Sequence, residues 1–127
     1  MRIVLTGLIF AAGLLFLFMG FGFLIDPVAS GTDFGLTAST AQGLATMRAD
    51  MTAFFIVAAL CMIWGAWRRN GDLLLVPAAL FGIALLGRCV GLVMDGPWTG
   101  YWMPMLVEGT VVILLLIASR VLPHRVG

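Results

Sequence analysis

Charged residues are scarce in this sequence, and lysine is missing from it altogether. Only 10% of the 127 residues are charged, whereas a soluble globular domain carries about 25%. The formal net charge is only +1, and no stripe of basic residues runs along the chain, so the sequence predicts no nucleic-acid partner. With 62% of its residues hydrophobic, the chain is typical of an integral membrane protein rather than a soluble domain.

Residue types that carry metal and redox chemistry are also few. There are two cysteines and one histidine, with no Cys-x-x-Cys spacing and no histidine pair. Cys61 and Cys89 fall in different apolar segments at different expected depths, so we expect no disulfide between them. Nucleophile elbows and phosphate-binding loops are missing as well. The sequence therefore predicts no metal site and no cofactor, and it leaves open whether the chain is an enzyme.

Long apolar runs are what the sequence does contain. A transmembrane helix needs about 20 mostly apolar residues to cross about 30 Å of hydrocarbon. The sequence predicts four such helices, at about 3–25, 44–67, 73–95 and 101–120. We expect an uncleaved first helix, because its apolar run exceeds the roughly 7–15 residues of a signal peptide. The prediction is one domain over residues 1–127, an all-α polytopic membrane protein with four transmembrane helices in an up-down bundle.

The connections between these helices differ in length. Residues 68–72 and 96–100 form short turns, and the first of them predicts a tight antiparallel hairpin of the second and third helices. The long connection, 26–43, is rich in small and polar residues. Ser39 to Gln42 fits a capping box, which predicts that the second helix begins near Thr40. The preceding segment is either a solvated linker or a lid over a site.

The charges outside the helices are distributed unevenly between the two sides. The side of the termini collects most of the basic residues: Arg2, Arg68, Arg69, Arg120 and Arg125, with His124 and a single acid, Asp72. The other side carries acids alone: Asp26, Asp33 and Asp95. Because basic loops stay in the cytoplasm, both termini are predicted to be cytoplasmic. The expected location is a bacterial inner membrane, which the chain crosses several times.

Arg48, Asp50, Arg88 and Glu108 lie inside or at the edge of the apolar segments. An ionisable side chain in hydrocarbon costs at least ~2.5 kcal/mol, so it must be paired or face a cavity. At a rise of 1.5 Å per residue, Arg88 and Glu108 both fall about 10 Å below the outer surface, and Asp50 lies near that depth. The sequence thus predicts that three helices place charges in one layer of the outer leaflet.

Helical spacing predicts which way these side chains face. Arg88 and Asp95 are two turns apart on one face, and Gly87 and Gly91 beside them would let a neighbouring helix approach closely. On the second helix, Arg48 and Asp50 are about 200° apart and cannot face the same way. Asp50 is expected beside a second stripe of small residues at the packed seam: Ala45, Ala49 and Ala53.

Two functions fit this pattern. In the first, five residues bind a small amphiphile such as a lipid head group, a quinone or an isoprenoid: Arg48, Asp50, Arg88, Glu108 and Asp95. In the second, Arg88 and Glu108 form an ion pair that fixes helix packing in an accessory or assembly subunit of a larger membrane complex. A transporter ranks last, because the inner halves of the helices are apolar and offer no polar path.

Several short motifs support a family resemblance. They are Gly87-Arg88 followed by Gly91, the helix exit Asp95-Gly96-Pro97, Arg48 early in the second helix and Glu108 early in the fourth. Together they resemble an uncharacterised bacterial family of four-helix integral membrane proteins, defined as a domain of unknown function and loosely similar to DoxX-like proteins. In that family, the arginine that corresponds to Arg48 is often followed by an aromatic residue and paired glycines. In this sequence, Arg48 is followed by Ala49-Asp50. The resemblance implies the architecture and the site position, and no reaction.

Overall fold

The computed structural model describes residues 2–122 and is helical throughout, with no strand in that range. The elements are α1 (Arg2–Ile25), α2 (Pro27–Thr32), α3 (Ala41–Thr46), the π-helical turn η1 (Met47–Met51), α4 (Thr52–Trp67), α5 (Leu75–Asp95) and α6 (Trp102–Val121). The predicted all-α fold is therefore confirmed. Arg125 and His124, two residues of the predicted basic side, lie outside the described residues.

Four helices in residues 2–122 are long and apolar enough to cross a membrane. They are Arg2–Ile25, Ala41–Trp67, Leu75–Asp95 and Trp102–Val121, where the second is α3, η1 and α4 in one continuous run. The predicted spans are confirmed, with ends that differ from the prediction by at most three residues. Their outer faces carry many exposed large hydrophobic side chains, as lipid-facing helices require.

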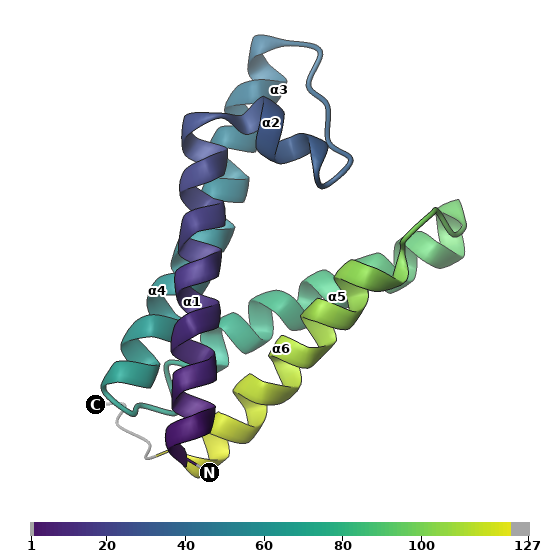
Figure 1. The fold of residues 1–127 in the computed structure, drawn as a ribbon. Helices are drawn as coiled ribbons and strands as arrows, with labels where there is room; N and C mark the ends of the chain where they lie inside the picture. The colour runs from purple at the N-terminus through teal and green to yellow at the C-terminus, as the bar shows by residue number, and fades with distance from the viewer. Residues whose placement is uncertain (1, 123–127) are drawn as a thin grey trace.

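The four long helices form two antiparallel pairs (Figure 1). α1 packs along α4, and α5 packs along α6. The pairs meet at the end that carries Arg2 and Val121, here called the terminal end, and diverge toward the end that carries α2 and the 96–101 connection, here called the splayed end. The expected tight hairpin of α4 and α5 is wrong. The short turn fixes only where the two helices start, and each then packs mainly on a different neighbour.

Glycines of α1 allow its close contact with α4. A Cβ atom on Gly20 would lie 2.6 Å from Ile56 Cγ1, and one on Gly13 would lie 2.8 Å from Ile63 Cγ1. The two stripes of small residues that were predicted to form helix contacts do not do so, and that prediction is wrong. No atom of a neighbouring helix comes within 4 Å of a Cβ built on Gly87 or Gly91. The three alanines of the other stripe are exposed: Ala45, Ala49 and Ala53. Small residues permit close packing, but the arrangement of the helices decides where it occurs.

Two caps shape the long connection. The Asp26 carboxylate accepts a hydrogen bond from the Ala29 amide at 3.1 Å, so that Asp26 caps α2, and Pro27 occupies the first turn. The Thr40 hydroxyl accepts one from the Gly43 amide at 3.1 Å, which confirms the predicted helix start. The long connection therefore contains a short helix, α2, and ends where α3 begins.

Candidate functional site

Arg88 of α5 and Glu108 of α6 form an ion pair between the two helices. The Arg88 Nε–H donates to Glu108 Oε1 at 2.7 Å, a short charge-assisted hydrogen bond. The Glu108 side chain is 10% exposed and that of Arg88 is 32% exposed. The predicted partnership is confirmed, and its cause is the one inferred from sequence: equal depth on adjacent antiparallel helices.

The pair uses only part of the hydrogen-bonding capacity of Arg88. A guanidinium carries four N–H donors on its two terminal nitrogens in addition to Nε–H. Within residues 2–122, no hydrogen bond engages those terminal groups. Arg88 and Glu108 both line a cavity. Donors in that position can bind an acceptor oxygen of a ligand without breaking the ion pair.

The cavity has a volume of about 920 Å³ and lies where the two helix pairs diverge. Residues of α1, η1 and α4 form one wall, and residues of α5 and α6 form the other. The 33–35 segment and the α5–α6 connection lie at its edge. The lining residues are Phe16, Met19, Asp33, Phe34, Gly35, Met51, Phe54, Phe55, Phe81, Ala84, Arg88, Trp98, Gly100, Met103, Pro104, Val107 and Glu108. A cavity of this size accommodates a drug-sized or lipid-sized ligand.

Aromatic rings dominate the lining. Phe55 is 4% exposed, and its ring packs on four others, those of Phe16, Phe23, Phe34 and Phe54, at centroid distances of 5.2–6.0 Å. The Phe54 and Phe81 rings meet edge-on at 5.3 Å, which joins α4 to α5. Five rings of this cluster line the cavity: Phe16, Phe34, Phe54, Phe55 and Phe81. They give a ligand an apolar, polarisable surface opposite the ion pair.

Three of the five predicted site residues do not line this cavity. Arg48 is exposed, and its Nε–H donates to the Leu24 carbonyl oxygen at 3.0 Å. That carbonyl belongs to the last turn of α1, which has no intrahelical partner for its final oxygens and carries a partial negative charge. The structure therefore gives Arg48 the position of a helix C-terminal cap, which ties α1 to η1.

Asp50 and Asp95 are exposed, and neither is among the residues that line the cavity. The π-helical turn explains the difference at Asp50. Asp50 lies inside this turn, Met47–Met51, where the backbone departs from the α-helical spacing used in the prediction. Met51 lines the cavity instead. The predicted cluster of charges from three helices is in fact one pair from two helices.

Other lining residues were not predicted as part of the site. Asp33 and Trp98 stand in connections, where sequence spacing gives no facing direction. Phe34 offered a signal, since a large aromatic residue in a segment of small residues needs a place to be buried. Phe54 and Phe55 provide apolar surface in the lining, whereas Leu92 and Met105 are not among the lining residues.

Other chemistry is limited in the described part of the chain. Cys61 and Cys89 are both free thiols. No group of three or more His, Cys, Asp or Glu side chains in residues 2–122 is placed to hold a metal ion. The arrangement is suited to binding through hydrogen bonds and apolar contact, with Arg88 and Glu108 as its charged groups and Asp33 at its edge.

Four apolar spans and a cavity beside an intramembrane ion pair define a multi-pass helical membrane protein. The chain belongs to the family described as the domain of unknown function DUF4345, whose profile matches residues 4–119. The resemblance to a family defined as a domain of unknown function is thereby confirmed, whereas the bacterial origin and the similarity to DoxX-like proteins stay predictions. No curated protein and no solved structure matches the chain.

Proposed function

We propose that this chain binds a small amphiphile or lipid in the cavity of the splayed end, with the ligand's polar head at Arg88 and Glu108. The observation that carries the proposal is a cavity of about 920 Å³ beside a shielded ion pair whose arginine keeps unused donors. In hydrocarbon an arginine is costly, and one that faces a cavity marks a binding site by default. The aromatic wall would receive the tail of the ligand.

The charges of the lining narrow the chemistry of the head. Arg88 is positive, whereas Glu108 and Asp33 are negative. A phosphate or carboxylate would be attracted by Arg88. It would also be repelled by Glu108, whose Oε1 lies 2.7 Å from Arg88 Nε. An uncharged head with a carbonyl or hydroxyl oxygen accepts from the terminal N–H groups of Arg88 without that repulsion. A neutral lipid or a quinone-like compound therefore fits better than an anionic head group.

A second candidate function is a non-catalytic accessory or assembly subunit of a larger membrane complex. The observation in its favour is that the Arg88–Glu108 hydrogen bond at 2.7 Å joins α5 directly to α6. In that function the pair would specify the packing of these helices. The two functions differ in whether the cavity must be filled for the protein to work.

A single substitution in the cavity wall separates these functions. Ala84 lines the cavity, and Ala79 on the same helix is exposed to the outside. We expect Ala84→Trp to fill the space and to reduce the amount of bound amphiphile at least about tenfold, which corresponds to ~1.4 kcal/mol. Ala79→Trp, the matched control, should retain it. Native mass spectrometry of the protein in mild detergent measures bound ligand and partner subunits together.

The outcomes of that measurement are distinct. Equal retention of amphiphile by the Ala84→Trp and Ala79→Trp variants would place the lipid elsewhere and contradict the proposal. A wild-type protein that is detected without a ligand but in a stoichiometric complex with a partner subunit would favour the accessory function. Loss of ligand in the Ala84→Trp variant alone supports the cavity as its site.

We propose further that the protein lies in a bacterial inner membrane with its termini in the cytoplasm. Arg2, Arg68, Arg69 and Arg120 lie at the terminal end, while Asp26, Asp33 and Asp95 lie at the splayed end. By the positive-inside rule the basic end faces the cytoplasm. The cavity would then open toward the outer leaflet, beneath the 33–35 segment.

Cysteine labelling in intact cells tests this orientation. Thr37 and Arg120 are exposed at opposite ends, and Cys61 and Cys89 can first be replaced by alanine. We expect a membrane-impermeant maleimide to modify Thr37→Cys in intact cells and Arg120→Cys only after lysis, because charged reagents do not cross the bilayer. The reverse pattern would invert the topology and move the cavity to the inner leaflet.

A further inference from the structure

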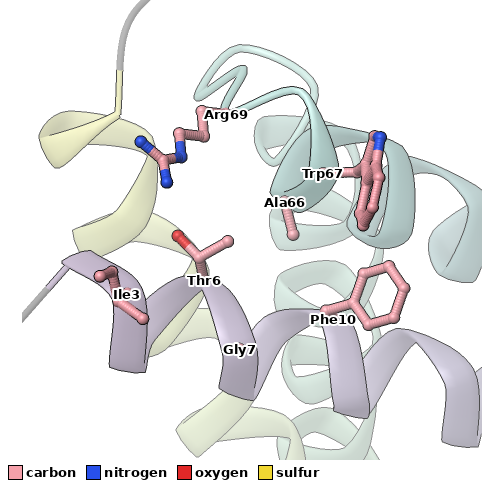
Figure 2. Close-up of a pocket in the computed structure, with 7 residues that line it drawn as sticks. All are labelled: Ile3, Thr6, Gly7, Phe10, Ala66, Trp67 and Arg69. Atoms are coloured by element: carbon pink, nitrogen blue, oxygen red, sulfur yellow. The ribbon is translucent and has the colours of Figure 1, made fainter.

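A second cavity lies at the terminal end, against the basic side of the protein (Figure 2). It measures about 360 Å³ and is lined by Ile3, Thr6, Gly7 and Phe10 of α1, by Ala66 and Trp67 of α4, and by Arg69. It shares no lining residue with the cavity of the splayed end. Whatever binds at one of these cavities is therefore recognised independently of the other.

The backbone at Arg69 directs its side chain to this cavity. α4 ends in a Schellman motif, in which the Asn70 amide donates to the Gly65 carbonyl at 2.8 Å and the Arg69 amide to the Ala66 carbonyl at 3.3 Å. The residue after the C-cap adopts a left-handed conformation, and glycine normally occupies it. Here it is Arg69, with φ of 52°, the one non-glycine residue with positive φ in residues 2–122. The chain thus places a cation where glycine would be unstrained.

The Arg69 guanidinium makes no hydrogen bond or ion pair within residues 2–122. Figure 2 shows it extending over the cavity, with the Thr6 hydroxyl turned to the same side. The neighbouring Arg68 is engaged differently, because its guanidinium stacks over the Trp64 ring at 5.4 Å. Arg69 and Thr6 together offer several donors at the mouth of an otherwise apolar space, a combination that suits a phosphate oxygen.

The rest of the lining suits an acyl chain. No atom lies within 4 Å of a Cβ built on Gly7, so the surface of α1 is open there, and Ile3 and Phe10 are apolar neighbours in the lining. The Phe10 and Trp67 rings lie side by side, with their centroids 6.2 Å apart. Because these residues lie at the ends of membrane-spanning helices, the cavity is at the level of the lipid head groups. A soluble anion would use only the polar edge of this space.

We infer that this cavity binds an anionic phospholipid, with the phosphate on Arg69 and Thr6 and one acyl chain over Gly7. Charge complementarity selects the lipid class. Arg2, Arg68 and Arg120 add positive charge to the same end, which attracts anionic lipids to the surface before one enters the cavity. The fixed position of Arg69 then distinguishes a defined site from general attraction.

The test compares lipid binding by three variants of the full chain, measured by native mass spectrometry with phosphatidylglycerol and with phosphatidylcholine. Arg69→Gly suits the left-handed backbone, so the fold should persist or gain stability while the cation is lost. We expect phosphatidylglycerol affinity to fall about tenfold in that variant, a change of ~1.4 kcal/mol. Arg120→Gln, which removes an exposed charge from the same end but does not line the cavity, should stay within about twofold.

Gly7→Leu fills the expected path of the acyl chain and should weaken phosphatidylglycerol binding without changing charge. Added inorganic phosphate should not displace the lipid at equal ionic strength. Equal losses in the Arg69→Gly and Arg120→Gln variants would reduce the effect to general surface charge and overturn the site. So would equal binding of the two lipids by the wild-type protein. Displacement by phosphate, with no effect of Gly7→Leu, would identify a free-phosphate site instead and overturn the lipid assignment.

Discussion

Glu108→Leu is expected to destabilise the protein by about 3 kcal/mol, the lower end of what is seen when one member of a buried ion pair is removed. The substitution leaves Arg88 charged in an apolar setting, without the oxygen that now binds its Nε–H at 2.7 Å. The lower end applies because Arg88 is 32% exposed and can recruit water through the cavity. Reversible unfolding in mixed micelles measures the loss, with helicity as the readout.

The double variant Arg88→Met with Glu108→Leu is the matched control. Replacing both charges by apolar side chains of similar size removes the unpaired charge, so most of the lost free energy of unfolding should return. Glu108→Gln should fall between these variants, because an amide oxygen still accepts from Arg88 without an ionic contribution. A double variant as unstable as Glu108→Leu alone would show that the cost does not come from an unpaired Arg88.

The same variants bear on function. If the pair serves only to fix packing, the double variant should fold and assemble like the wild-type protein. If Arg88 holds the head of an amphiphile, the double variant should fold but lose its ligand, because methionine offers no donor. Stability and ligand retention therefore respond differently, and measuring both on one sample separates the scaffold from the binding site.

Gly20→Val should cost about 1–3 kcal/mol, the usual range when extra carbon atoms are forced into a packed interface. The new Cβ would lie 2.6 Å from Ile56 Cγ1 and 3.3 Å from the Ile56 amide nitrogen. The Ile56 side chain can rotate, but its backbone cannot retreat without separating α1 from α4. Since this is the most extensive helix contact in residues 2–122, the substitution should lower the thermal midpoint of the whole bundle.

Gly7→Val on the same helix is the control for Gly20→Val. No atom lies within 4 Å of the Cβ position at Gly7, so this substitution tests helix propensity and side-chain entropy without a clash. We expect its midpoint to match that of the wild-type protein or to exceed it. Equal destabilisation by both substitutions would mean that α1 tolerates valine poorly for reasons unrelated to its contact with α4.

Local and one-dimensional features of this fold could be predicted from the sequence. Apolar length predicts a span because the thickness of the hydrocarbon is fixed, and all four spans are present. Thr40 was identifiable as a helix start because a cap depends on residues only a few positions away. Arg88 and Glu108 could be paired in advance because the short 96–100 turn and a constant rise per residue fix their relative depth.

The remaining features depend on distances and angles between helices, which hydropathy does not encode. The cavity lies where the two helix pairs diverge, and this depends on α1 packing mainly on α4 and α5 mainly on α6. The role of Arg48 depended on the end of another helix, the Leu24 carbonyl, that no spacing on its own helix could reveal. Asp50 was misplaced because it lies inside a π turn, Met47–Met51, where the α-helical spacing used for the prediction does not hold. The sequence by itself determined the four spans and the relative depth of Arg88 and Glu108 along them, because span length and rise per residue are local quantities. Tertiary packing decided that Arg48, Asp50 and Asp95 stay outside the cavity, because that depends on how the helices are oriented toward one another.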